Sequence, residues 1–203
     1  MASQIAGADE TVSSLYSVKS EQATMLSFDT YNYLVHYFGQ PQGSMADDPN
    51  GTLGGDYEFV ISDATADRIE LKGKKYGNRI VMKAFSADQT WKQYLTRIKK
   101  VEDDAFFYEY DLRMDGLYTG QMLRSNYTFI VTYYDEVGKV YQKTVPFMFT
   151  TDGMRFHEPV TIDGQTMQNF VWKNEEISFV CTDEGATGVK MKGIYIDGYQ
   201  SYD

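Results

Sequence analysis

Few residues in this sequence have side chains whose chemistry could support catalysis. There are two histidines, His36 and His157, and one cysteine, Cys181. A Ser-His-Asp or Cys-His site must use one of these imidazoles, and the G-x-S-x-G turn that presents a nucleophilic serine does not occur. Cys181 ends the alternating run 178–181, a pattern typical of a core cysteine rather than a nucleophile. The sequence therefore gives no catalytic residue, and we expect a protein that is not an enzyme.

Acidic residues are plentiful, but their spacing defines no metal or acid–base site. Residues 47–51 (DDPNG) share the composition of a calcium loop but lack its alternating ligand positions and its distant bidentate glutamate. Residues 102–104 close a predicted helix and are typical of a solvated helix end. A glycosidase needs two facing carboxylates, and no pair stands out. One cysteine and two histidines are too few for a zinc site rich in either. We expect no metal and no cofactor.

Aromatic residues give the strongest indication of ligand binding. The chain has 17 Tyr, 12 Phe and 2 Trp, and Tyr and Trp can stack on a sugar ring or anchor a partner protein. The densest cluster is 31–38, in which Tyr31, Asn32 and His36 are the candidate ligand-binding residues. Because β-sheets also favour aromatic residues, the cluster has an alternative interpretation as part of the hydrophobic core or its cover.

The charge and length exclude several classes of protein. The 203 residues carry 19 Lys and Arg against 29 Asp and Glu, a net charge of −10. Such a surface repels nucleic-acid phosphates and anionic lipid headgroups. No stretch approaches the roughly 20 apolar residues of a membrane span, and residues 1–10 lack the features of a signal peptide. Two alternatives remain, a cytoplasmic protein or part of an exported protein whose start has been removed.

Short alternating runs separated by turn signals predict a mainly β, antiparallel fold. The clearest runs in the first part of the chain are 57–61, 68–72 and 79–83. Ile69 and Leu71 fall on one face of the second run, and Gly-Asn at 77–78 suits a hairpin turn. Asp-Gly pairs recur at 115–116, 152–153, 163–164 and 197–198, and two longer strands are expected at 127–135 and 139–150. Turns at this density favour a meander over βαβ units.

One segment has helical periodicity. Ser86 and Gln89 have the spacing of a capping box, and apolar residues follow at helical intervals from Trp91 to Ile98. This pattern predicts a helix over about 87–101. The aromatic segment 29–38 is a second candidate for a short helical turn.

Residues 59–73 (FVISDATADRIELKG) resemble residues 179–193 (FVCTDEGATGVKMKG). Any two hairpins share some pattern, but the matched Lys and Gly positions favour a duplicated β unit. The two histidines have nearly the same offset, so we interpret them as matched structural residues of the repeat. Too few residues precede the first copy for a complete unit, which predicts that the chain begins inside it.

The expected architecture is two antiparallel β lobes joined by one α-helix: residues 1–85, a linker helix at 86–104, and residues 105–203. Each lobe should curl toward a barrel or sandwich, because long open edges aggregate. An open strand edge is expected near the first lobe, with residues 1–12 flexible or recruited to it. We also expect the first lobe to be the less stable one.

The runs 26–32 (LSFDTYN), 55–59 (GDYEF) and 71–77 (LKGKKYG), with His36, resemble a family of lipoproteins from gut Bacteroidetes classed as a domain of unknown function (family 4302). The likeness covers about 15–203. It implies an exported protein anchored at the outer-membrane cell surface by an acylated cysteine upstream, often encoded among nutrient-uptake proteins. The family carries no catalytic motif that could be transferred.

These observations lead to one functional expectation and two alternatives. The expectation is a non-enzymatic cell-surface lipoprotein that helps to capture a nutrient, either a glycan or a peptide. The first alternative is a structural docking subunit of a surface complex, and the second is a hydrolase. The expected partners are a glycan or peptide ligand or a surface protein, with no nucleic acid, and with membrane contact only through the upstream lipid anchor.

Overall fold

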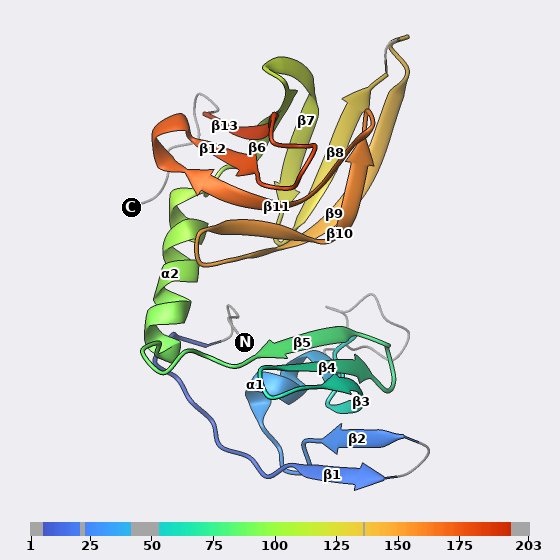
Figure 1. The fold of residues 1–203 in the computed structure, drawn as a ribbon, viewed down its shortest axis with the longest axis vertical. Helices are drawn as coiled ribbons and strands as arrows, with labels where there is room; N and C mark the ends of the chain where they lie inside the picture. The colour runs from blue at the N-terminus through green and yellow to red at the C-terminus, as the bar shows by residue number, and fades with distance from the viewer. Residues whose placement is uncertain (1–5, 21–22, 42–52, 136, 196–203) are drawn as a thin grey trace. The chain divides into compact units, whose positions relative to one another are not determined.

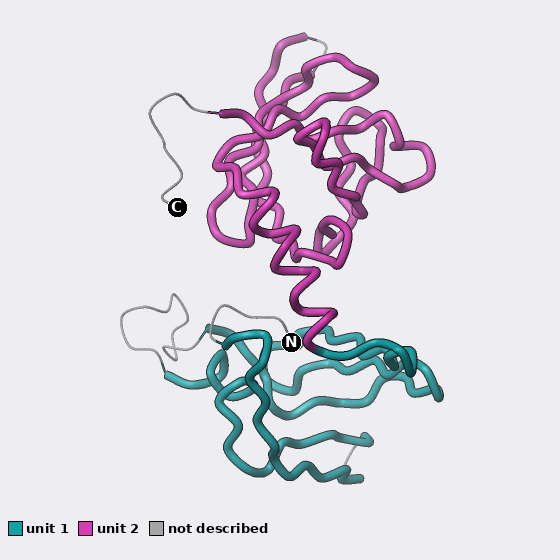
Figure 2. The backbone as a smooth tube through the Cα atoms, turned by 90° about the vertical axis from the view of Figure 1, so that its left-hand side faces the viewer, with its two compact units in different colours: residues 1–91 teal, residues 92–203 magenta. Residues whose placement is uncertain are grey.

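The computed structural model describes residues 6–20, 23–41, 53–135 and 137–195 (Figure 1). The chain divides into two compact units, residues 1–91 and 92–203 (Figure 2). Each unit is built from antiparallel strands, so the prediction of a mainly β protein in two lobes is confirmed.

Unit 1 is a five-stranded antiparallel sheet whose strand order follows the sequence. Its strands are β1 (Ser17–Ser20), β2 (Thr24–Ser27), β3 (Glu58–Ala64), β4 (Arg68–Gly73) and β5 (Arg79–Lys83), and α1 (Tyr33–His36) and η1 (Tyr37–Gly39) lie between β2 and β3 in sequence. Leu71 of β4 is buried opposite Ile80 of β5. The turn before β5 uses Gly77 with φ +75°, as its Gly-Asn pair predicts.

Unit 2 is a closed eight-stranded barrel in which β13 pairs with β6. The elements are α2 (Trp91–Asp104, which begins at the boundary residue), β6 (Glu109–Met114), β7 (Leu117–Ser125), β8 (Thr128–Tyr134), β9 (Val140–Phe149), β10 (Gly153–Ile162), β11 (Gln165–Lys173), η3 (Asn174–Glu176), β12 (Ser178–Cys181) and β13 (Val189–Ile194). Two hairpins turn on Asp115-Gly116 and Asp163-Gly164, each with positive φ at both residues. These are the primed turns that Asp-Gly favours.

The interior of the barrel is filled by side chains from alternate positions of its strands. Phe129 and Phe147 stack with their ring centroids 4.4 Å apart, and Tyr110 packs edge-on against Phe129. Ile98 and Val101 of α2 join the same buried cluster. The helix predicted as a linker is therefore packed as part of unit 2.

Two details differ from the sequence-based expectations. The helix begins at Trp91 rather than about residue 87, because the Gln89 N–H donates to the Ser86 carbonyl and closes a separate turn. The first lobe is a single open sheet rather than a barrel or sandwich, since five strands of four to seven residues cannot close on themselves.

The two copies of the sequence repeat both form antiparallel hairpins, β3–β4 and β12–β13, but their registers differ. Phe59 lies opposite Gly73, whereas Phe179 lies opposite Met191, two residues short of the equivalent position. The interpretation of the histidines as matched residues is wrong, because His36 lies in helix α1 and His157 in strand β10. The duplication itself stays a prediction.

Candidate functional site

The structure places the three candidate residues at the two ends of the short helix α1: Tyr31 and Asn32 precede it, with Asn32 as the N-cap, and His36 is its last residue. The Asn32 Oδ1 accepts a hydrogen bond from the Leu34 N–H at 3.0 Å, and the Asn32 Nδ2 donates to the Val12 carbonyl at 3.3 Å. The Asn32 side chain is buried, and both its Oδ1 and its Nδ2 form hydrogen bonds within the protein. Asn32 therefore fixes the local backbone rather than offering its amide to a ligand.

The rings of Tyr31 and His36 form a cluster with a third ring, that of Tyr57. The His36 imidazole stacks on Tyr57 with centroids 4.9 Å apart and planes 23° from parallel. The Tyr31 ring also contacts the His36 imidazole, with ring centroids 5.4 Å apart. Tyr31 is 62% exposed and Tyr57 43% exposed. These three residues are called the ring cluster below.

Tyr57 reaches His36 because the chain passes closely against the end of η1. The Gly55 N–H donates to the Phe38 carbonyl at 2.8 Å, and a Cβ on Gly55 would overlap the Phe38 side chain. Only glycine permits this approach, which delivers Tyr57 two residues later. Tyr57 was not among the candidate residues predicted from the sequence, although it lies in the run 55–59, one of the runs that carry the family resemblance.

The chemistry that the ring cluster offers is stacking combined with hydrogen bonding at its rim. His36 Nδ1 lies 2.9 Å from the main-chain carbonyl oxygen of Asn32 and 3.1 Å from the main-chain nitrogen of Asn32. This side of the imidazole is therefore held to the backbone. Nε2 makes no hydrogen bond within the described residues. The Tyr31 hydroxyl donates to Gln40 Oε1 at 3.3 Å. Exposed ring faces with polar edges suit a sugar ring.

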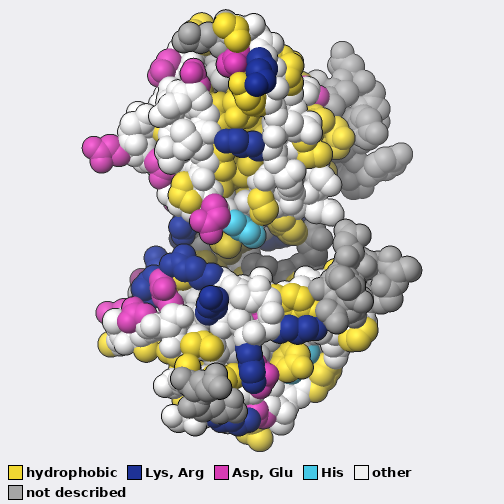
Figure 3. All heavy atoms as spheres, turned by 90° about the vertical axis from the view of Figure 1, so that its right-hand side faces the viewer, with side chains coloured by type: hydrophobic (Ala, Val, Ile, Leu, Met, Phe, Trp, Pro, Cys, Tyr) yellow, Lys and Arg dark blue, Asp and Glu magenta, His cyan; other side chains and the backbone are white. Residues whose placement is uncertain are grey.

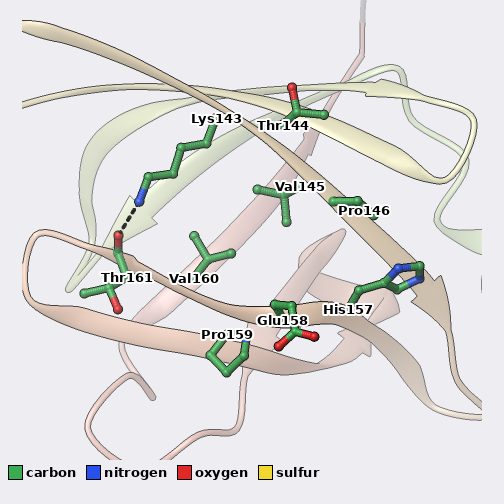
Figure 4. A pocket seen from close by; sticks show the side chains of 9 residues that line it. All are labelled: Lys143, Thr144, Val145, Pro146, His157, Glu158, Pro159, Val160 and Thr161. Atoms are coloured by element: carbon green, nitrogen blue, oxygen red, sulfur yellow. Dashed lines mark hydrogen bonds between the residues drawn. The ribbon is translucent and has the colours of Figure 1, made fainter. Parts of the chain in front are cut away.

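A pocket of about 440 Å³ lies in unit 2 between β9 and β10 (Figure 4). The side chains of Val145 and Val160 extend into the space between the two strands, and Lys143 reaches across it to the Thr161 carbonyl, 2.9 Å from Nζ. The remaining lining residues are Thr144, Pro146, His157, Glu158 and Pro159. No sequence signal used above pointed to this pocket, because it depends on pairing between strands.

Exposed apolar residues are frequent on the strands near this pocket. Tyr134, Val140 and Met148 of β8 and β9 are each about half exposed. Figure 3 shows one face of the molecule, on which hydrophobic side chains form a band over unit 2, interrupted by Lys or Arg side chains. An apolar band of this kind is typical of an interaction surface.

Cys181 has the environment of a core residue. Its side chain is buried in the barrel, and its Sγ lies 3.4 Å from Asp183 Oδ2. Burial raises the pKa of the thiol to about 11, because the thiolate loses its hydration. At neutral pH the sulfur is therefore a protonated thiol and a poor nucleophile.

The acidic string 47–51 lies outside the described residues. Among the residues that the structure does describe, no three His, Cys, Asp or Glu side chains are grouped so as to hold a metal ion. In the same part of the chain, no helix has the length and apolar character needed to cross a bilayer.

Comparison with known proteins gives one positive result. No curated protein and no solved structure matches the chain. The family model for the domain of unknown function DUF4302 matches residues 1–174, a range that includes the whole of unit 1 and the barrel strands as far as β11. The match begins earlier and ends earlier than the resemblance over 15–203 suggested. Because the match covers most of the sequence, the chain belongs to the DUF4302 family.

Proposed function

We propose that this protein is a non-enzymatic cell-surface lipoprotein that captures a nutrient glycan, and that the ring cluster of Tyr31, His36 and Tyr57 binds the sugar. The observation that carries the proposal is the exposure of two tyrosine rings packed against a histidine whose orientation the backbone fixes. Rings that are already ordered lose little conformational entropy when a ligand binds, which favours affinity.

The cellular setting is part of the same proposal. It rests on the resemblance of residues 26–32 and 55–77 to lipoproteins of gut Bacteroidetes, which implies export and a lipid anchor upstream of this sequence. The net charge of −10 supports a partner other than nucleic acid. The protonated, buried thiol of Cys181 supports a binding role over hydrolysis by a cysteine nucleophile.

The test is glycan binding by the complete chain and by variants of the ring cluster. A glycan array identifies the ligand, and titration calorimetry then measures its affinity. Tyr57→Ala should weaken binding about tenfold, the usual cost of removing an anchoring aromatic side chain. Tyr57→Phe should bind like the wild type, since it keeps the stacking face.

The matched control is Tyr16→Ala, which removes another exposed tyrosine of unit 1 from outside the ring cluster. It should leave the affinity unchanged. If no glycan binds, or if Tyr57→Ala binds a glycan as tightly as the wild type does, the proposal is wrong.

The alternative function, a docking subunit of a surface complex, is favoured by a different observation. Strands β9 and β10 pair over only part of their length, and the pocket of unit 2 lies between their unpaired portions. Unpaired strand edges can bind another polypeptide by strand addition.

A further inference from the structure

The barrel of unit 2 is closed between β9 and β10 by only a short ladder. The paired residues are Phe149 with Met154, Met148 with Arg155, and Phe147 with Phe156. Beyond Phe147 the two strands separate, although each continues for several residues (Figure 4). The separated portions, 140–146 of β9 and 157–162 of β10, are called the open edges below.

Proline and a glutamine side chain explain where the ladder ends. The next hydrogen-bonded pair in this register would join residues 146 and 157, but Pro146 has no N–H to donate. The Gln168 Nε2 instead donates to the carbonyls of Phe156 and His157, at 3.1 and 3.3 Å. Four residues of β10, 156–159, therefore stand opposite the single residue Gln168 of β11. This bulge turns β10 away from β9.

The open edge of β9 carries main-chain groups that point away from its other neighbour, β8. The Phe147 N–H donates to the Tyr127 carbonyl, and the Asp135 N–H donates to the Lys139 carbonyl, so odd-numbered residues of β9 face β8. Residues alternate along an antiparallel strand. Val140, Gln142 and Thr144 therefore direct both N–H and C=O toward β10, which is out of ladder contact with them.

The space between the open edges is lined by one cation, Lys143, and one carboxylate, that of Glu158, and the two form no ion pair. Lys143 is the cation at the mouth; its Nζ donates to the Thr161 carbonyl and lies 5.7 Å from the centroid of the Tyr133 ring. Val145 and Val160 form the apolar floor. The cleft thus combines an apolar floor, unpaired main-chain groups and an ammonium that has no ion-pair partner among the described residues.

We propose that an extended polypeptide segment bearing a carboxylate binds in this cleft as an added strand along β9. Its main chain would pair with Gln142 and Thr144, its apolar side chains would rest on Val145 and Val160, and its carboxylate would pair with Lys143. The edge of an intact sheet is excluded as occupant because β10 flanks the cleft on its far side, so only a single strand can enter. This site lies in unit 2 and is independent of the ring cluster.

The experiment is selection of random heptapeptides displayed on phage, with the complete wild-type chain as bait and Thr144→Pro for counter-selection. Proline at 144 removes an N–H of the open edge and leaves the β8–β9 ladder intact, because that N–H points away from β8. A synthetic peptide made from the enriched sequences should bind Thr144→Pro at least about tenfold more weakly. The enriched sequences should be acidic, and should lose this bias on Lys143→Met.

Two controls separate strand addition from a disturbed fold. Thr144→Ala keeps the N–H and should bind the synthetic peptide within about twofold of the wild type. Two versions of the peptide should be compared, one N-methylated at its odd-numbered amides and one at its even-numbered amides. Only the version whose methylated amides face β9 should lose binding, and the protein itself is unchanged in this test. In hydrogen exchange, the bound peptide should protect the amides of Gln142 and Thr144.

The proposal is wrong if no peptide is enriched, if the peptide binds the wild type and Thr144→Pro equally, or if both N-methylated versions bind as tightly as the unmethylated peptide. Protection of the Gln142 and Thr144 amides by an oligosaccharide mixture but by no peptide would also overturn it, and would assign the cleft to a glycan instead.

Discussion

The carboxylate of Glu102 lies 3.7 Å from the Nη2 atom of Arg124, and both side chains are buried where α2 packs on the barrel. The Tyr127 hydroxyl donates to the same carboxylate at 3.0 Å. The Arg124 guanidinium also lies 5.1 Å from the ring centroids of Phe106 and of Phe149. This pair therefore fixes the end of the helix over an aromatic part of the core. Each of the two buried charges is compensated by the other.

Glu102→Gln should destabilise unit 2 by about 2–3 kcal/mol, because it leaves the buried guanidinium without a counter-charge. Urea unfolding at neutral pH measures this change. Asp103→Asn is the matched control on the same helix, since Asp103 pairs with Lys99 at the surface. The control should cost less than about 0.5 kcal/mol. Equal effects of the two substitutions would show that burial of the Glu102–Arg124 pair does not matter.

The strands and turns could be predicted because their signals are local. Asp115-Gly116 and Asp163-Gly164 prefer positive φ wherever they occur, and the flanking alternation marks the strands. The start of α2 was misplaced because Ser86 and Gln89 fit both a capping box and an isolated turn. The register of β12–β13 could not be predicted from the sequence pattern either, because a shift of two residues leaves every side chain on the same face of the sheet.

The two candidate sites differ in how far the sequence could predict them. Tyr31 and His36 are close in sequence, so their cluster was visible. Tyr57 joins them only through the contact of Gly55 with η1. The cleft in unit 2 was hidden even though Pro146 is plain in the sequence, because its effect depends on which residue of β10 lies opposite. Such non-local pairing is set by the closed barrel.

Gly73→Ala should destabilise unit 1 by about 1–3 kcal/mol, the usual cost of forcing extra volume into a packed site. A Cβ at this position would overlap the carboxylate of Asp56. That carboxylate is buried and accepts hydrogen bonds from the backbone N–H groups of Lys75 and Tyr76, so displacing it also disturbs the turn before β5. Thermal unfolding followed by hydrogen exchange in β3 and β4 measures the loss.

The matched control for this substitution is Gly7→Ala. Gly7 is also in unit 1, has nothing within 4 Å of the added methyl, and does not have a positive φ. It should unfold like the wild type. Wild-type stability of Gly73→Ala would mean that Asp56 can move aside without cost, contrary to the packing described above.

Unit 2 should lose stability on acidification through Asp183. Its carboxylate accepts hydrogen bonds from the Asn169 side chain at 2.6 Å and from the backbone N–H groups of Asn169 and Gln168 at 2.8 and 2.5 Å. Burial alone would raise the pKa of Asp183, but these bonds together outweigh it and hold the pKa below the ordinary 3.8. The contribution is therefore complete above about pH 4 and is lost as the pH falls through the lowered pKa.

Asp183→Asn tests this assignment by removing the titrating group. The variant should be less stable at neutral pH by about 1–2 kcal/mol, because an amide accepts fewer of the three bonds. Its stability should also fall less steeply than that of the wild type below pH 4. Asp152→Asn, which alters a surface carboxylate bonded to the Thr150 hydroxyl, should keep the wild-type slope. An unchanged slope in Asp183→Asn would assign the acid sensitivity to other groups.

Unit 1 should open before unit 2 in native-state hydrogen exchange. Among the described apolar side chains of unit 1, only Met25, Phe59 and Leu71 are buried, whereas the barrel and α2 share one continuous buried cluster. Among the described residues, the sheet of unit 1 also ends in an edge strand on each side, β1 and β5, whereas unpaired edges in the barrel are confined to the open edges of β9 and β10. Less buried area and more exposed backbone lower the free energy of opening.

The fair comparison is between strands that have a neighbour on each side, β3 in unit 1 and β7 in unit 2. The hydrogen-bonded amides of β3 should exchange at least about tenfold faster, which corresponds to an opening free energy about 1.4 kcal/mol lower. Mass spectrometry of peptic fragments after timed labelling resolves the two strands. The comparison uses residues 58–60 of β3 and 120–123 of β7, which have a paired strand on both sides. Equal or stronger protection of 58–60 would mean that the small core of unit 1 is not the weaker one.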